Sequence, residues 1–201
     1  VGLPQGDSPL LLNTSYTITA DIEVWEGGAE GMILTSGGRF AGYGFYLLEG
    51  KPVFLWNLVN LKRVKWEGPE ALTPGKHTIE FDFKYDGLGI GTLAFNNMSG
   101  IGRSGTGTLK VDGKVVDTKE MKRTLPIILQ WDESFDIGSD TLTGVNDADY
   151  KPPFPLTAKL DKLTIKVDRP QLTEEDIKKL ETSRATAVDG SPIQHLQGGP
   201  H

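Results

Sequence analysis

Two carboxylates at alternate positions of one predicted strand are the first residues whose spacing could support chemistry. Glu80 and Asp82 lie in the predicted strand 77–85, and a spacing of two places both side chains on one face. Glycoside hydrolysis needs such a pair, with one carboxylate as nucleophile and another as acid. The next position on that face is Lys84, which favours an ordinary solvated face with a cross-strand ion pair. Glycoside hydrolysis through Glu80 and Asp82 is therefore the third of three functional hypotheses.

A group of acidic residues within 18 positions is the densest set of possible metal ligands: Asp132, Glu133, Asp136, Asp140, Asp147 and Asp149. Calcium takes about six to eight oxygen ligands, which acidic loops can supply. The spacing does not match an EF-hand loop, and aspartate is common in turns for structural reasons. We name Asp136 and Asp140 as calcium candidates and expect no other cofactor in this chain.

Large aromatic residues could provide flat surfaces on which sugar rings stack, although such residues more often fill a sandwich core. Trp56 lies among Phe54, Leu55 and Leu58, so we expect it in the core. Trp66 has polar neighbours, which predicts an exposed side chain. Trp66 and Tyr43 are the predicted ligand-binding aromatics.

No group of residues matches the pattern of a nucleophilic active site. The chain has no cysteine, its histidines are scattered, and no GxSxG sequence accompanies them. Residues 100–105 (GIGRSG) match the dinucleotide-binding fingerprint by letter, but a strand follows them where that motif requires a helix. The sequence therefore predicts a chain without a catalytic centre of its own.

The composition limits the possible partners. The net charge of −6, with both signs interspersed, disfavours a nucleic-acid partner. No run of apolar residues is long enough to cross a membrane. The chain starts at Val1 without a methionine or a charged leader, so we expect that any signal peptide has been removed or never existed. It begins like a fragment, and both a fragment of a longer protein and a complete protein are compatible with the sequence.

Short apolar runs separated by glycine and proline predict an all-β antiparallel sandwich with one short C-terminal helix. The helix is expected to begin after Thr173 and to end near Glu181. Residues 1–182 are predicted to form one sandwich domain, and 183–201 a disordered tail. The predicted strands cover 15–25, 31–36, 43–48, 53–58, 61–66, 77–85, 108–111, 114–118, 127–135 and 158–167.

Several segments in this order resemble the C-terminal domain of bacterial-type arylsulfatases, a concanavalin A-like or laminin G-like jelly roll. The most specific segment is FDIGSDTLTGVNDADYKPPFP, and LDKLTIKVDRPQLTEEDIKKLE continues it. NTSYTITADIEVWEGGAE and GTGTLKVDGKVV also match, so that the resemblance covers most of residues 13–181.

The resemblance implies a role without catalysis. Sulfatases of this type use a formylglycine made within a C/S-x-P/A-x-R motif, and this chain lacks that motif. The implied domain packs beside a sulfatase catalytic domain and helps to shape its substrate entrance. The implied location is periplasmic or secreted in a bacterium, and the absence of cysteine is also compatible with the cytoplasm.

The first functional hypothesis is therefore an accessory domain that docks on a sulfatase catalytic domain. Its expected contact residues lie on a long polar and aromatic loop that a sandwich core does not require: Phe135, Asp136, Gly138, Asp140, Tyr150, Pro153 and Phe154. The alternative is an independent carbohydrate-binding, lectin-like module. Alanine substitutions in the loop are expected to weaken docking while leaving stability nearly unchanged.

Overall fold

A computed structural model describes residues 8–9, 11–86, 103–124 and 133–168, together with Glu174, Lys178 and Thr182. The predicted helix therefore lies mostly outside the described residues, although Glu174, Lys178 and Thr182 have helical backbone. The predicted tail of 183–201 also lies outside them. No helix in the described part of the chain has the length and apolar character needed to cross a membrane.

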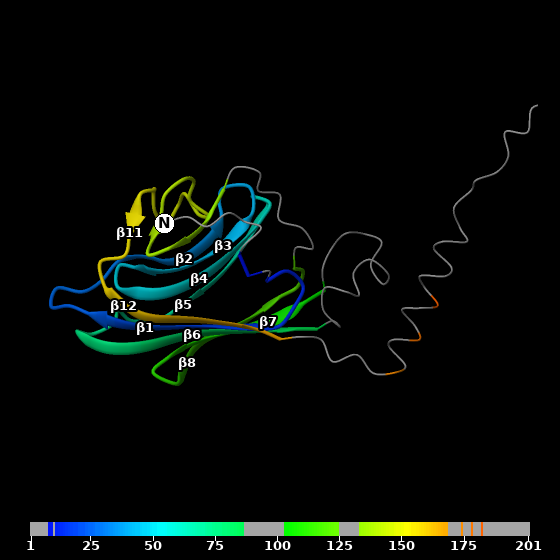
Figure 1. Cartoon of the computed structure of the whole chain (residues 1–201), viewed down its shortest axis with the longest axis horizontal. Coiled ribbons are helices and arrows are strands. Elements are labelled where there is room, and N and C mark those ends of the chain that lie inside the picture. The colour runs from blue at the N-terminus through cyan, green and yellow to red at the C-terminus, as the bar shows by residue number, and fades with distance from the viewer. Residues whose placement is uncertain are drawn as a thin grey trace, which may run out of the picture.

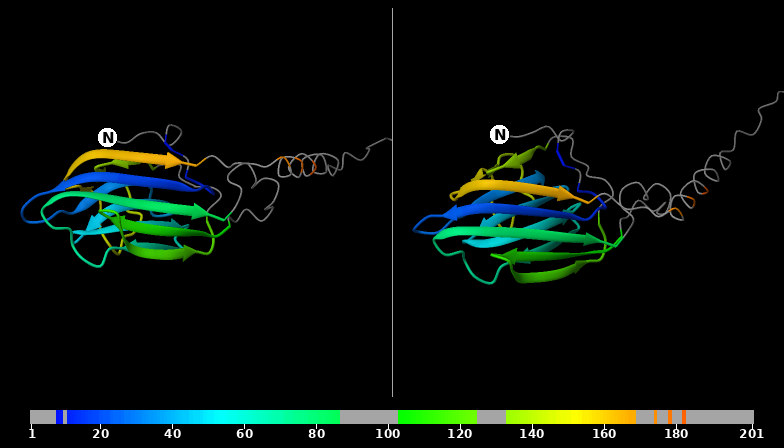
Figure 2. Two further views of the ribbon diagram at one scale, coloured as in Figure 1. Left: turned by 90° about the horizontal axis from the view of Figure 1, so that it is seen from below. Right: turned by 60° about the horizontal axis from the view of Figure 1, so that its bottom comes forward.

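Two sheets lie face to face, as predicted for a sandwich (Figure 1). In the first sheet, all neighbouring strands are antiparallel. Its strand order is β12 (Lys159–Val167), β1 (Tyr16–Val24), β6 (Gly75–Tyr85), β7 (Gly105–Val111) and β8 (Lys114–Met121), and Figure 2 shows this order from the side of that sheet. The alternation in β1 and β6 confirms the period of two read from the sequence.

The second sheet is built around three strands that are buried almost throughout: β2 (Gly31–Gly37), β3 (Gly42–Leu48) and β4 (Lys51–Leu58). β5 (Lys62–Glu67) pairs with β4, while three short strands pair on or near the other side of β2: β9 (Phe135–Ile137), β10 (Ser139–Asp140) and β11 (Phe154–Pro155). Strands buried on both faces need a cover on each side of the sheet.

The main core fills the space between the two sheets with aromatic side chains. Phe54 of β4 stacks on Phe81 of β6 with ring centroids 3.6 Å apart, and the Trp66 ring packs against Phe81 edge-on at 4.9 Å. The buried Trp56 indole donates a 2.8 Å hydrogen bond to the Tyr16 hydroxyl, so the polar atoms of both rings are paired inside the core. Trp56 is thus a core residue, as predicted.

A smaller apolar cluster covers the outer face of the second sheet. It joins Met32, Tyr46, Val53 and Leu55 of the sheet to Val145 and Tyr150 from the segment 141–153. That segment follows β10 and leads into β11, so it crosses the sheet as a cover. It explains why β2, β3 and β4 are buried on both faces.

The hairpin at Asp112-Gly113 is present as predicted, with both residues at positive φ. Glu49-Gly50 makes the same kind of turn between β3 and β4. Of the strand predicted over 127–135, only its end is described, where β9 begins at Phe135. β10 and β11 were not predicted, because two-residue strands carry no periodic signal.

Candidate functional site

Glu80 and Asp82 lie on the outer face of the first sheet, where each carboxylate has partners on a neighbouring strand. Lys110 pairs with Glu80 at 2.8 Å, and the Thr17 hydroxyl donates to Asp82 at 2.9 Å. Thr19 donates to Glu80 at 3.4 Å. The cross-strand ion pair predicted for this face is therefore present.

The prediction of an exposed Trp66 is wrong. Trp66 is 0% exposed and Tyr43 is 1% exposed, because both side chains point between the sheets. Within β5 the inward positions are Val64 and Trp66, so the polar neighbours of Trp66 belong to the opposite face of an alternating strand. Neither aromatic ring can stack on a sugar in this fold.

The segment predicted to contact a partner is largely buried within the chain itself. Among its members Phe135, Asp136, Asp140 and Tyr150 are buried, Gly138 and Phe154 are half-buried, and Pro153 is exposed. The buried side chains hold the cover of the second sheet in place. Docking through this segment stays a prediction for Gly138, Pro153 and Phe154, which are at least partly exposed.

Tyr150 is the main anchor of the cover. Its hydroxyl donates a 2.5 Å hydrogen bond to Asp140 and accepts one of 3.1 Å from the Val145 backbone N–H. Its ring stacks on Phe154 with centroids 4.5 Å apart. A second anchor forms where Asp149 accepts a hydrogen bond from the Tyr46 hydroxyl.

The two calcium candidates are Asp136 and Asp140, which lie close enough to affect each other electrostatically. Burial, with the nearby charges of Asp136 and Glu133, raises the pKa of Asp140 to about 6, against the lowering effect of the Tyr150 hydrogen bond. Asp136 accepts a 2.8 Å hydrogen bond from Thr141 through one oxygen, while its other oxygen is buried without a hydrogen-bond partner. No group of three or more potential ligand side chains gathers in the described part of the chain. Calcium at this pair stays a prediction.

Three exposed apolar side chains lie on the connections that meet at one end of the second sheet. Phe40 is 72% exposed between β2 and β3, Leu61 is 89% exposed between β4 and β5, and Leu142 is 51% exposed in the cover segment. We call Phe40, Leu61 and Leu142 the apolar loop tips. Figure 1 shows the β2–β3 and β4–β5 connections at the end of the sheet opposite the β1–β2 turn.

One buried side chain, Asn57, ties these connections together. Its amide nitrogen lies 3.2 Å from the Gly38 carbonyl oxygen, 2.9 Å from that of Arg39 and 3.1 Å from that of Val145. Its carbonyl oxygen accepts a 2.9 Å hydrogen bond from the Asn60 backbone N–H. Asn57 therefore joins the β2–β3 connection, the β4–β5 connection and the cover segment at one point.

Further hydrogen bonds and positive charges frame the apolar loop tips. The Arg39 backbone N–H donates a 3.1 Å hydrogen bond to Thr143, the neighbour of Leu142. Arg39 and Lys62 are exposed and Arg63 is half-buried, and of these Arg39 pairs with Asp147 at 3.6 Å. The connections that carry the tips are thus fixed to one another, and the carboxylates of Glu133 and Asp147 lie beside them together with these cations.

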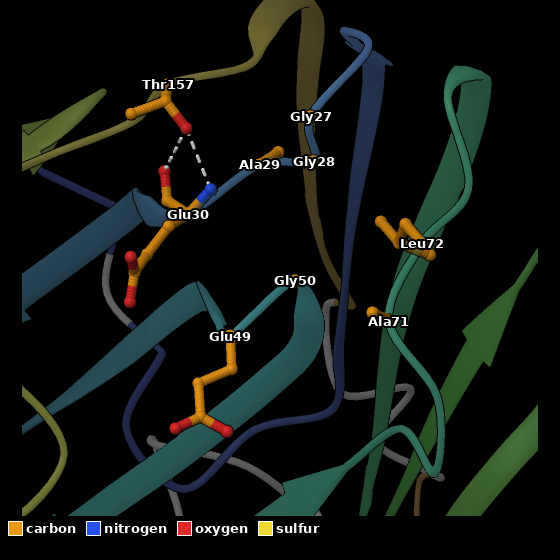
Figure 3. A pocket seen from close by; sticks show the side chains of 9 residues that line it. All are labelled: Gly27, Gly28, Ala29, Glu30, Glu49, Gly50, Ala71, Leu72 and Thr157. Carbon is orange, nitrogen blue, oxygen red and sulfur yellow. Dashed lines mark hydrogen bonds between the residues drawn. The ribbon is translucent and has the colours of Figure 1, made fainter.

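A shallow pocket of about 420 Å³ lies at the opposite end of the sandwich. The β1–β2 turn, the β3–β4 turn, Ala71-Leu72 and Thr157 form its walls, and Figure 3 shows the side chains that line it. Glu30 and Glu49 belong to its lining, but Figure 3 shows their carboxylates directed away from the space between Gly28, Gly50 and Leu72. Sequence reasoning missed both this pocket and the apolar loop tips, although Phe40 and Leu61 stand in turns, where apolar residues are unusual.

No protein-family model and no curated protein matches this chain. Domains LG4-5 of the mouse laminin α1 chain align with a TM-score of 0.55 at 16% identity, over 84% of this chain and 40% of that chain. The CBM40 domain of the Ruminococcus gnavus IT-sialidase aligns with a TM-score of 0.48 at 13% identity, over 86% of this chain and 84% of that chain. The binding domain of botulinum neurotoxin serotype D aligns at 0.46 and 12% identity, over 89% of this chain and 39% of that chain.

The laminin alignment confirms a laminin G-like, concanavalin A-like jelly roll. This chain spans less than half of that laminin structure. The likeness shows the fold alone, so functional arguments have to come from the surfaces described above.

Proposed function

We propose that this chain is a non-catalytic accessory domain that docks on a partner domain through the apolar loop tips. The observation that carries the proposal is the joint exposure of Phe40, Leu61 and Leu142 on connections held by one buried asparagine. Exposed large apolar side chains that cluster at one place mark interaction sites on protein surfaces.

The fixed positions of the tips favour docking energetically. Burying a leucine or phenylalanine side chain completely contributes about 1.5–3 kcal/mol. Because Asn57 already holds the connections, little conformational entropy is lost when the tips become buried. A few well-placed apolar side chains therefore suffice for a specific complex.

The partner that we propose is a sulfatase catalytic domain. This part of the proposal rests on the sequence resemblance over most of residues 13–181. Beside the tips, the cations Arg39, Lys62 and Arg63 outnumber the carboxylates Glu133 and Asp147, which favours a partner surface that is apolar in its middle and carries some acidic groups at its edge. The proposed location is periplasmic or secreted.

The test is calorimetric titration of this chain with the catalytic domain of a bacterial-type arylsulfatase produced as a separate polypeptide. We expect the double variant Phe40→Ser, Leu61→Ser to bind at least tenfold more weakly, since each substitution removes a buried apolar contact. Val115→Ser is the matched control, because Val115 is 60% exposed on β8, away from the tips. Equal affinity of the double variant and the control would contradict the proposal.

A further inference from the structure

His77 lies near the start of β6 with an acceptor oxygen at each of its ring nitrogens. Its Nδ1 atom is 2.7 Å from a carboxylate oxygen of Asp112, and its Nε2 atom is 2.8 Å from the Thr73 carbonyl oxygen. Carboxylate and carbonyl oxygens accept hydrogen bonds, so each of the two contacts needs an N–H group on the ring. An imidazole ring carries two N–H groups when it is protonated and positively charged. The observed geometry is therefore that of a charged histidine.

Asp112 is held in place by the backbone of β6. Its Oδ1 atom accepts a 2.9 Å hydrogen bond from the Thr78 N–H, and its own N–H donates one of 2.8 Å to the Thr78 carbonyl. Partial burial favours the neutral carboxyl group, but the hydrogen bonds from Thr78 and His77 and the charges of His77 and Lys114 outweigh it and lower the pKa of Asp112. Asp112 is thus a fixed anionic acceptor for Nδ1 at neutral pH.

Thr73 offers the Nε2 atom of His77 a second kind of partner. The Thr73 hydroxyl oxygen lies 3.4 Å from Nε2, the same nitrogen that faces the Thr73 carbonyl. A neutral imidazole with its hydrogen on Nδ1 has a lone pair on Nε2, which repels a carbonyl oxygen and accepts a hydrogen bond from a hydroxyl group. Loss of one proton therefore exchanges a contact with the backbone for a contact with a side chain.

Other charged side chains lie on the elements around His77: Asp21 and Glu23 on β1, Glu49 and Lys51 at the β3–β4 turn, Glu70 in the connection 68–74, Lys76 on β6, and Lys114 on the β7–β8 hairpin. In the strand register Ile22 is opposite His77, so Asp21, Glu23 and Lys76 project from the other face of the sheet. Asp112 is the charged group that contacts the ring.

Thr73 connects this ring to one wall of the pocket. Ala71 and Leu72, which precede it, line the pocket and lie beside Gly50 in Figure 3. The Leu72 N–H donates a 2.9 Å hydrogen bond to the Gly50 carbonyl. The side chain of His77 is 12% exposed, so little water can replace a contact that the ring gives up. The connection 68–74 is thus held by Gly50 at Leu72 and by His77 at the next residue.

We propose that His77 is a pH-dependent latch on the connection 68–74, independent of the docking proposed above. In its charged state the ring joins Asp112 to the Thr73 backbone and holds the connection against the β7–β8 turn. In its neutral state the ring keeps the hydrogen bond to the carboxylate, because charged acceptors form the stronger bonds, and it releases the Thr73 carbonyl. Histidine side chains change charge between about pH 5 and pH 8. The pocket wall formed by Ala71 and Leu72 therefore loosens as the pH rises through this range.

Nitrogen NMR of the histidine rings in the full chain tests the two states directly. Spectra are recorded from about pH 5 to about pH 9, and the signals of His77 are those that disappear in His77→Gln. We expect both ring nitrogens of His77 to carry hydrogen at the acid end, and Nδ1 alone to carry it at the alkaline end. A neutral ring with its hydrogen on Nε2 would keep the Thr73 contact and overturn the proposal. So would a ring that keeps one charge throughout.

Amide hydrogen exchange at Leu72 measures the hold on the connection. We expect its protection, corrected for the intrinsic pH dependence of exchange, to fall roughly tenfold between about pH 5.5 and about pH 8, because one charge-assisted hydrogen bond is lost. In His77→Gln the protection should be the same at both pH values. The Gly28 amide, which donates to the Trp25 carbonyl on the β1–β2 turn, is the internal reference.

Lys76→Gln is the matched control variant, since it removes a positive charge from the exposed neighbour of His77 on the other face of β6. Its Leu72 protection should depend on pH as in the parent chain. Leu72 protection that does not change with pH in the parent chain, or that changes equally in His77→Gln, would overturn the latch.

Discussion

Two buried polar side chains, Asn57 and Asp140, control much of the surface on which function depends. Asn57 is fully buried and satisfies its hydrogen bonds on three separate segments. Asp140 is 1% exposed and accepts a hydrogen bond from Tyr150 on the cover. Since buried polar groups are costly without partners, each side chain fixes the segments that satisfy it.

Replacing Asn57 should loosen the apolar loop tips. We expect Asn57→Ala to lower the free energy of unfolding by on the order of 3 kcal/mol, because several buried backbone groups lose their partner. Asn57→Asp is the sharper comparison, since aspartate keeps an acceptor for the Asn60 N–H and loses the donors to the carbonyl groups. Urea denaturation with hydrogen exchange at residues 58–61 measures both effects. Unchanged exchange there in both variants would show that Asn57 does not hold the tips.

Asp140 should make stability depend on pH in the acid range. Its pKa is raised from 3.8 to about 6, so the folded chain binds the proton that the unfolded chain has already lost between these values. Stability from this group is complete below about pH 4, falls as pH rises to 6, and is constant above that. Over this pH range the titration of Asp140 lowers the free energy of unfolding by at most about 3 kcal/mol.

Asp140→Asn removes this titration and keeps an acceptor for the Tyr150 hydroxyl. We expect the variant to gain stability over the parent chain progressively between pH 4 and pH 7. Denaturant unfolding at several pH values measures the difference. A difference that stays constant over this range would contradict the assigned environment of Asp140.

The burial of Asn57 and of Trp66 can be predicted from the sequence. Asn57 is a polar residue inside the apolar run VFLWNL, and a buried polar residue in such a run requires partners, although its partners are distant in the chain. The burial of Trp66 was predictable from the alternation of Val64 and Trp66 within β5. Its polar sequence neighbours gave the wrong expectation because adjacent residues in a strand face opposite sides.

The cover segment 141–153 is the element whose role differs most from the sequence-based expectation. Its aromatic and acidic residues were interpreted as a contact surface because a sandwich core needs no such loop. The structure uses Val145 and Tyr150 to cover the outer face of the second sheet. The local sequence could not reveal this, since the covered residues Met32, Tyr46 and Leu55 lie far away along the chain.

Tyr150 should therefore matter for stability. We expect Tyr150→Ala to lower the free energy of unfolding by about 3–5 kcal/mol, as for other buried aromatic residues. Tyr150→Phe should cost about 1–2 kcal/mol, because it removes one of the hydrogen-bond donors to the buried Asp140. Lys151→Ala is the control, since Lys151 is the exposed neighbour. Thermal and urea unfolding measure all three, and a stable Tyr150→Ala would restore the expectation that this segment serves mainly for contact.

Other elements were predictable because their signals are local. The alternation in β1 and β6 and the Asp112-Gly113 turn depend on neighbouring residues only. The pairing of β10 and β11 with the second sheet depends on long-range contacts, so these two-residue strands were not predicted. The predicted strand 127–135 overlaps β9 at Phe135. Local sequence patterns therefore predicted the two-layer sandwich but not the short strands β10 and β11 at the edge of its second sheet.

The two ends of the sandwich differ in chemistry. One end carries the apolar loop tips among charged side chains of both signs, and the other carries a shallow pocket lined largely by glycine, alanine and leucine. A domain built this way can hold a partner at one end while the pocket at the other end remains uncovered. This arrangement suits an accessory module with two separate surfaces.

Hydrogen exchange of this chain, alone and bound to an arylsulfatase catalytic domain, tests the docking directly. We expect protection on binding at residues 38–42, 58–62 and 141–143, because these segments carry the apolar loop tips. Residues 27–30 and 49–50, which border the pocket, should exchange as in the free chain. Protection confined to the pocket end, or a complex that leaves the tips unprotected, would contradict docking through Phe40, Leu61 and Leu142.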